Sequence, residues 1–244
     1  MRNLRMTIDY DGSKYKGWQK QTDNELTIQG KIETVLSKLT GEEIQVVGCG
    51  RTDAGVHAKN YIANFHTNCK YNIDKILDYL YEYLPEDIVI KSMEEAAERF
   101  HARYNVQSKT YVYTINNNKY RNVFTRKYSY HIAEKLNLLE MRKASEVLIG
   151  SHDFQSFTNV RSEKTTVRMI NYINFIDNDG ILKIEVNGNG FLWNMVRIIV
   201  GTLIEVGKGN LKNIDVERIL NEKKRREAGH LAQAKGLCLK DVKY

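Results

Sequence analysis

The chain has 244 residues, with 37 Lys and Arg against 30 Asp and Glu, so its formal net charge is +7. Its 42% hydrophobic and 27% charged residues exclude a disordered chain, and its length allows one large domain or two small ones. The positive charge permits a nucleic-acid partner without requiring one, and three cysteines without a CxxC pair fit neither a disulfide framework nor a zinc site.

The first hundred residues alternate between strand and helix patterns. The elements expected in chain order are a strand at 4–10, a helix capped by Thr27 and stopped by Gly41, strands at 44–47 and 61–65, a helix at 73–84 and a strand at 88–90. This order is β-α-β-β-α-β. No signal peptide or membrane span is expected, because the chain begins directly with a strand pattern.

The remaining residues repeat that order and add one helix. We expect a strand at 111–115, a helix at 136–148, strands at 167–175 and 181–186, a buried helix at 191–206, a surface helix at 211–223 and a closing strand at 237–242. The predicted fold is therefore α+β, with two ferredoxin-like halves, 1–104 and 105–244. We expect one continuous mixed antiparallel sheet, helices packed on one face, and an active-site cleft between the halves.

Motifs for nucleotide cofactors and metals are incomplete. The Gly-x-Gly runs at 48–50 and 188–190 lack the third glycine of a dinucleotide site, and no P-loop lysine follows Gly55. Cys49, His57, His66 and Cys69 are close in sequence, but their spacing matches no zinc template. We therefore expect no dependence on ATP or NAD, and free thiols with solvated or packed histidines rather than a zinc site.

The segment 46–58 carries three glycines and places Arg51, Thr52 and Asp53 on a loop between two strands. Two interpretations stay open for this loop. Asp53 is either a turn residue that binds its own backbone, or a carboxylate held where a substrate can reach it.

The apolar segment 191–203 has two strongly polar side chains near its centre, Asn194 and Arg197. A buried guanidinium needs an anionic partner. Arg197 either reaches the surface or makes a structural pair, or it pairs with Asp53 and keeps that carboxylate ionised.

Cations and aromatic residues are mixed in the segments 99–104, 109–113, 119–121 and 126–128. They form either solvated strand faces, or a surface that holds RNA phosphates and stacks on bases.

Taken together, the motifs resemble the tRNA pseudouridine synthase A family over essentially the whole chain and in the same order. The matching motifs are Asp11–Gln19, Gly50–His57, Leu84–Ile88, Phe100–Tyr104 with Tyr111–Tyr113, Gly150–Phe154, Met195–Arg197 and Gly236–Leu239. The resemblance implies a cytoplasmic isomerase, a homodimer without a cofactor, that converts uridine to pseudouridine in the tRNA anticodon arm, at nucleotides 38, 39 or 40.

The resemblance also implies roles for individual residues. Asp53 matches the catalytic aspartate, which attacks the sugar or the uracil ring or promotes a glycal route. Tyr111 matches the tyrosine that packs on the target base, and Arg197 matches the partner of the aspartate. The substrate-binding residues expected are Arg51, which is linked to base flipping, Leu237 and Leu239 on the pocket floor, and Thr52, His57 and Arg103.

The sequence departs from the family pattern at Tyr61, Tyr81, Tyr83, Leu231 and Gln233. These departures leave Asp53 untouched but put the choice of RNA in doubt. The alternatives are a divergent paralogue that acts on other tRNA uridines or on rRNA or another structured RNA, and a non-catalytic RNA-binding protein on the same scaffold.

Overall fold

The computed structural model of the chain describes residues 1–22, 26–159 and 165–244. The chain forms two compact units: unit 1 comprises Met1–Gln107 and Cys238–Tyr244, and unit 2 comprises Ser108–Leu237. All the predicted site residues lie within the described ranges. Within these ranges, no helix combines the length and the apolar character needed to cross a membrane.

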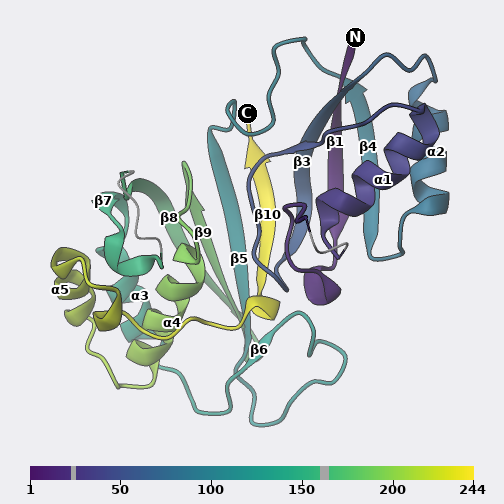
Figure 1. Cartoon of the computed structure of the whole chain (residues 1–244). Helices are drawn as coiled ribbons and strands as arrows, with labels where there is room; N and C mark the ends of the chain where they lie inside the picture. Colours follow the sequence, from purple (N-terminus) through teal and green to yellow (C-terminus); the bar gives the residue numbers. More distant parts are fainter. Residues whose placement is uncertain (23–25, 160–164) are drawn as a thin grey trace. The chain divides into compact units, whose positions relative to one another are not determined.

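Unit 1 is a mainly antiparallel sheet with two helices (Figure 1). Its elements are β1 (Arg2–Tyr10), the 3-10 helix η1 (Gly12–Lys14), α1 (Ile28–Thr40), β2 (Val47–Gly48), β3 (His57–Thr67), α2 (Ile73–Tyr83), β4 (Ile88–Glu95) and β10 (Leu237–Lys243). β1 pairs with β3 and β4, and β2 pairs with β3, all antiparallel. The order β4-β1-β3-β2 is that of a ferredoxin-like unit, which confirms the prediction for the first half.

The last strand of the chain belongs to unit 1. In β10, Cys238 lies opposite His57 and Leu239 opposite Ala58, in parallel register with β3. Residues 238–244, which the sequence pattern assigned to the second half, therefore group with unit 1. The chain passes into unit 2 after Gln107, close to the predicted boundary at residue 104.

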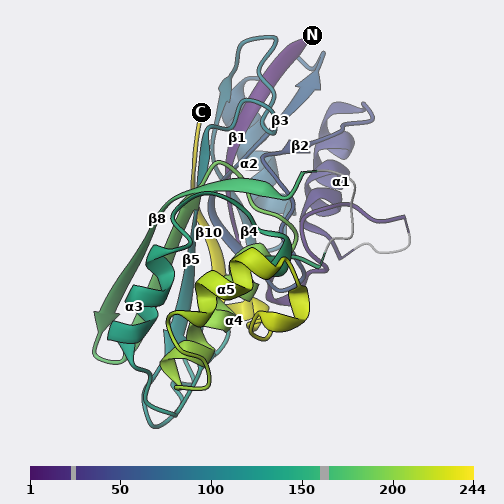
Figure 2. The same cartoon turned by 90° about the vertical axis from the view of Figure 1, so that its left-hand side faces the viewer.

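Unit 2 contains an antiparallel sheet in the order β5-β9-β8-β7, with β6 paired to β5 in parallel. Its elements are β5 (Ser108–Asn116), β6 (Tyr130–His131), α3 (Leu138–Glu146), β7 (Gly150–Asp153), η2 (Gln155–Phe157), β8 (Val167–Asn178), β9 (Ile181–Gly188), α4 (Met195–Gly207), α5 (Asp215–Glu222), η3 (Arg225–Glu227) and η4 (Ala234–Gly236). Helices α3 and α4 pack side by side on one face of this sheet (Figure 2). β6 and β7 were not predicted, because strands of two and four residues are too short for an alternation pattern.

Local sequence signals explain the limits of α1. The Thr27 hydroxyl accepts a hydrogen bond from the Gly30 amide at 3.3 Å, and Gly41 ends the helix with φ +71°. The hydrophobic core of unit 1 includes six completely buried side chains from β1 and α1. They are Leu4, Met6 and Ile8 of β1 and Ile28, Ile32 and Leu36 of α1. Alternation in the strand and helical spacing in α1 thus build one apolar layer.

Several elements are shorter than predicted, and α5 (Asp215–Glu222), expected at 211–223, is one of them. Helix α4 begins at Met195 rather than at residue 191, because Asn194 has φ +63°, in the left-handed region. The strand expected at 44–47 is reduced to Val47–Gly48. The backbone amide and carbonyl of Val46 bind side chains of α1 instead of a strand.

Candidate active site

Asp53 lies in the loop 49–56, which joins β2 to β3 in unit 1. Its carbonyl accepts a hydrogen bond from the Val56 amide at 3.1 Å, and Gly55 has φ +77°. The loop therefore makes a tight turn at Asp53, whose side chain is half-buried.

The segment 10–18 supports this turn. The Trp18 amide donates to the Thr52 carbonyl at 3.2 Å, and the Gly55 amide donates to the Tyr15 carbonyl at 3.2 Å. The hydroxyl of Tyr10 lies 2.8 Å from Oγ1 of Thr52. Thr52, which was predicted to bind substrate, is buried, so its side chain fixes the loop from within.

Two glycines of this segment are needed because the backbones approach closely. A Cβ atom at Gly12 would lie 2.0 Å from the Val56 carbonyl oxygen, and one at Gly17 would lie 2.5 Å from the Thr52 carbonyl oxygen. Gly17 also has φ +100°. Contact with the Asp53 loop thus accounts for both glycines of the Asp11–Gln19 motif.

An aromatic cluster fills the space under the loop. The rings of Trp18 and Tyr61 stack with their centroids 4.0 Å apart, and Tyr10 lies 5.7 Å from Tyr61. The hydroxyl of Tyr61 donates to the Gly50 carbonyl. Tyr61, one of the departures from the family pattern, is thus a buried support of the loop.

His57, at the start of β3, is also buried. Its Nδ1 lies 3.1 Å from the Gly12 amide, and 3.1 Å from a carboxylate oxygen of Asp11. These contacts tie the end of the Asp53 loop to the turn at 11–12. Contact of His57 with a substrate stays a prediction.

The two arginines predicted for unit 1 are exposed. Arg51 precedes Asp53 by two residues, and its Nε donates to Oε1 of Gln19 at 3.2 Å. Arg103 lies in a turn where its amide donates to Nδ1 of His101 at 3.2 Å. Arg51 is therefore next to the candidate carboxylate in sequence, whereas Arg103 lies on a separate turn.

In unit 2, Tyr111 lies on β5 opposite Val186 of β9. Its ring is buried and meets Phe191 edge-to-face, with the ring centroids 5.3 Å apart. This packing fixes the ring plane of Tyr111.

Arg197 lies in the first turn of α4. Its Nε donates to the Ala232 carbonyl at 2.8 Å, and Nη1 donates to Oδ1 of Asn194 at 3.2 Å. Burial raises the pKa of Tyr113, and the positive charge of Arg197 partly opposes that rise. Arg197 is in unit 2 and Asp53 in unit 1, so their ion pair stays a prediction.

The predicted floor residues are both buried, Leu237 in unit 2 and Leu239 in unit 1. Leu239 lies opposite Ala58, next to His57. Leu239 therefore pairs with β3 just after the end of the loop that carries Asp53.

Sequence reasoning missed a set of polar contacts beside the loop. Gln29 and Glu33 of α1 connect to Gln19, the hydrogen-bond partner of Arg51. The available signal was the spacing of Gln29 and Glu33, one helical turn apart and next to an apolar stripe. In the described part of the chain, no group of three or more His, Cys, Asp or Glu side chains is placed to hold a metal ion.

Comparison with known proteins shows the family of the chain. A family model described as tRNA pseudouridine synthase matches residues 6–105 and 144–244. The chain is 66% identical to tRNA pseudouridine synthase A 1 of Clostridium tetani, with 100% of both chains covered. It is 49% identical to tRNA pseudouridine synthase A 2 of Bacillus cereus and 44% identical to tRNA pseudouridine synthase A of Clostridium acetobutylicum, again over 100% of both chains. The chain therefore belongs to the tRNA pseudouridine synthase family, a family of isomerases.

Proposed function

We propose that the chain converts uridine to pseudouridine in the anticodon stem-loop of tRNA, at nucleotide 38, 39 or 40, with Asp53 as the catalytic nucleophile. The observation that carries the proposal is the Asp53 loop, in which a half-buried carboxylate is fixed by backbone contacts beside exposed Arg51. Membership of the family supports the choice of tRNA, and the resemblance supports the nucleotides, a homodimer and a cytoplasmic location.

The reaction needs few chemical groups. The N1–C1′ bond of uridine breaks and a C5–C1′ bond forms, while N1 gains a proton and C5 loses one. No redox equivalent or phosphate donor is consumed. In the proposal Asp53 acts on the target nucleotide, Tyr111 packs on its base, and Arg197 compensates the charge of Asp53.

The target nucleotide must leave its helix before it can react. Arg51, the exposed arginine beside Asp53, is proposed to hold the flipped conformation. The buried side chains of Leu237 and Leu239 are proposed to form the apolar floor under the base.

A basic loop in unit 2, residues 117–128, supports contact with RNA. It contains four cations, Lys119, Arg121, Arg126 and Lys127, and no acidic residue. Its exposed aromatic side chains are Tyr120, Phe124 and Tyr128. Cations bind backbone phosphates and exposed rings stack on unpaired bases, so the composition fits a nucleic-acid contact.

The test is tritium release from RNA labelled at C5 of uridine, with anticodon stem-loops and rRNA fragments as substrates. We expect release by the wild type and none by Asp53→Asn. Asp74→Asn, which changes an exposed carboxylate of α2 in the same unit, is the matched control and should behave like the wild type.

Each part of the proposal has its own contrary result. No release from any RNA would remove the enzymatic function, and release by Asp53→Asn would remove the role of Asp53. Mapping the modified uridine decides between the anticodon arm, other tRNA positions and rRNA.

A further inference from the structure

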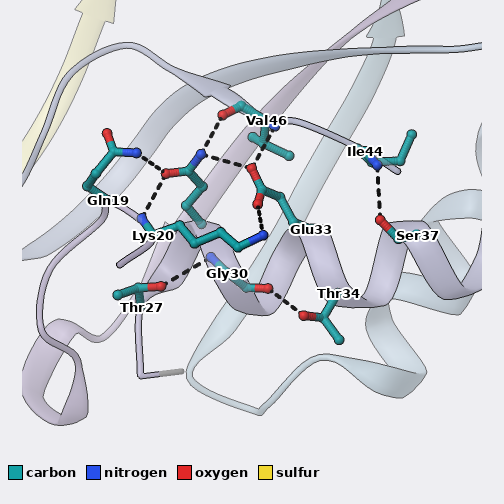
Figure 3. Close-up of polar contacts among 10 residues, drawn as sticks. Gln19, Lys20, Thr27, Gly30, Glu33, Thr34, Ser37, Ile44 and Val46 are labelled. Atoms are coloured by element: carbon teal, nitrogen blue, oxygen red, sulfur yellow. Dashed lines mark hydrogen bonds and ion pairs between the residues drawn. The ribbon is translucent and has the colours of Figure 1, made fainter. Parts of the chain in front are cut away.

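A continuous line of hydrogen bonds connects Arg51 to a buried carboxylate on α1. Nε of Arg51 donates to Oε1 of Gln19 at 3.2 Å, and Nε2 of Gln19 donates to Oε1 of Gln29 at 2.7 Å. Nε2 of Gln29 then donates to Oε1 of Glu33 at 2.8 Å. Figure 3 shows the part of this line between Gln19 and Glu33. We call these three residues the Gln19–Gln29–Glu33 network.

The direction of every hydrogen bond in this network follows from Glu33. An ionised carboxylate can only accept hydrogen bonds, so Gln29 must turn its NH₂ group toward Glu33. Its carbonyl oxygen then faces Gln19, which in turn presents its own carbonyl oxygen to Arg51. Because a guanidinium can only donate, this is the orientation that Arg51 requires.

Several contacts fix the position of Glu33, which ends the network. Its side chain is 6% exposed, and Oε1 also accepts from the Val46 amide at 3.0 Å. Oε2 lies 3.1 Å from the ammonium group of Lys20. A buried carboxylate is stable only with such partners, so its position is well defined.

The same residues hold the backbone that leads to the loop. Val46 donates its amide to Glu33, and its carbonyl accepts from Nε2 of Gln29 at 3.1 Å. Gln29 also accepts from the Lys20 amide at 2.9 Å. Helix α1 therefore holds the backbone at Lys20, next to Gln19, and at Val46, before the loop that carries Arg51.

Within the described residues, the Arg51 guanidinium makes one hydrogen bond, from Nε to Gln19, and no ion pair. Nη1 and Nη2 are thus left to present a planar pair of donors to a phosphate or a base.

We propose that Glu33 is a positioning residue for Arg51, and that it sets the orientation of the arginine through Gln29 and Gln19. The inference rests on the proposed function for the role of Arg51 in base flipping. Glu33 acts on Arg51 indirectly, since the side chains of Gln29 and Gln19 lie between them.

The first test compares single-turnover rates of pseudouridine formation at saturating tRNA. We expect Glu33→Ala to lower the rate about tenfold, because the Gln19–Gln29–Glu33 network loses its terminal acceptor. Glu33→Gln should restore most of the rate, since its amide oxygen can still accept from Gln29 and Val46. Glu42→Gln is the matched control, because Glu42 likewise holds backbone in unit 1, at the Asn68 amide.

A double-mutant comparison separates positioning from general damage to the fold. In an Arg51→Ala background, Glu33→Ala should cause no further loss of rate. Gln29→Met breaks the network but leaves Glu33 its bonds to the Val46 amide and the Lys20 ammonium group, while the Val46 carbonyl and the Lys20 amide lose Gln29. It should lose about as much rate as Glu33→Ala. An equal loss with and without Arg51, or wild-type rates for both variants, would overturn the proposal.

A second readout does not depend on catalysis. The ¹⁵N resonance of Arg51 Nε, assigned by comparison with Arg51→Lys, should show a slowly exchanging proton in the free wild-type protein. Gln29→Met should make that exchange at least several times faster, whereas Glu42→Gln should not change it. If the wild type modified no RNA, the proposed function would fail, and this measurement would still decide whether Glu33 positions Arg51.

Discussion

The hydroxyl oxygen of Tyr10, at the end of β1, lies 2.8 Å from Oγ1 of Thr52, the residue that precedes Asp53. Both side chains are buried, so the bond joins a rigid strand to the turn that carries the candidate nucleophile.

We therefore predict that Tyr10→Phe lowers the rate of isomerisation and causes only a small loss in the free energy of unfolding. The variant leaves the Thr52 hydroxyl without its partner, which should cost about 1 kcal/mol in the free energy of unfolding. Misplacement of the turn should lower the tritium-release rate about tenfold. Urea unfolding and the rate assay check the two effects.

Tyr244→Phe is the control, because its hydroxyl also donates within unit 1, to the Ala102 carbonyl at 2.6 Å. It should lose a similar amount of stability and keep its rate. Equal rates for Tyr10→Phe and Tyr244→Phe would show that the contact with Thr52 does not matter for the reaction.

A second prediction concerns the close approach of Gly17 to the loop. Gly17→Ala would add a Cβ atom 2.5 Å from the Thr52 carbonyl oxygen, in a residue with φ +100°. Gly41→Ala has a similar backbone cost at φ +71°, but nothing lies within 4 Å of its Cβ. We expect Gly41→Ala to cost about 1 kcal/mol in unfolding free energy, and Gly17→Ala clearly more, with a loss of activity. Equal unfolding midpoints in urea would contradict this.

The local parts of the fold were predictable because they depend on neighbouring residues. Thr27 and Gly41 marked both ends of α1, and alternation marked β1. The predicted start of α4 was wrong, because the left-handed conformation of Asn194 leaves no signal in hydrophobic spacing.

Long-range relationships were harder to predict. Cys238 and Leu239 of β10 pair with β3 although about 180 residues separate them in sequence, and no periodicity specifies that partner. Within the site, the Gly50–His57 motif pointed to Asp53, but Glu33 and Gln29 were hidden among ordinary helix positions. Their role depends on which loop packs against α1, and this is a property of the folded chain.

A third prediction uses the thiol of Cys238, which is opposite His57 in β10. Burial raises the pKa of Cys238 to about 11. At pH 8 only about one thiol in a thousand is then ionised, compared with roughly a quarter for a free cysteine of pKa about 8.5. Iodoacetamide should therefore alkylate Cys238 roughly two hundredfold more slowly in the folded than in the urea-unfolded protein.

The sign of the stability effect follows from the same shift. The folded state holds this proton more tightly than the unfolded state, so the stabilisation is complete below a pH of about 8.5. It is lost as the pH rises toward about 11. Mass spectrometry of alkylated peptides across this range gives the measurement, and a labelling rate already at its maximum near pH 8 would contradict the raised pKa.

The last prediction addresses RNA binding by the basic loop 117–128. The side chains of Arg121 and Arg126 are exposed, and neither forms an ion pair with a described residue. By contrast, Lys223 lies 2.8 Å from Asp153 and Lys224 lies 3.7 Å from Glu222, so acidic neighbours already compensate these two cations. Both pairs of residues belong to unit 2, which makes them matched sites for removing two charges.

We expect the double variant Arg121→Ala and Arg126→Ala to weaken tRNA binding. The slope of the logarithm of affinity against the logarithm of salt concentration should fall by about two, or about one for each lost phosphate contact. Lys223→Ala with Lys224→Ala should leave affinity and slope near the wild-type values. If the loop instead joins two copies of the chain, the first variant would change the molecular mass in solution and leave the salt slope unchanged, which sedimentation and filter binding together would reveal.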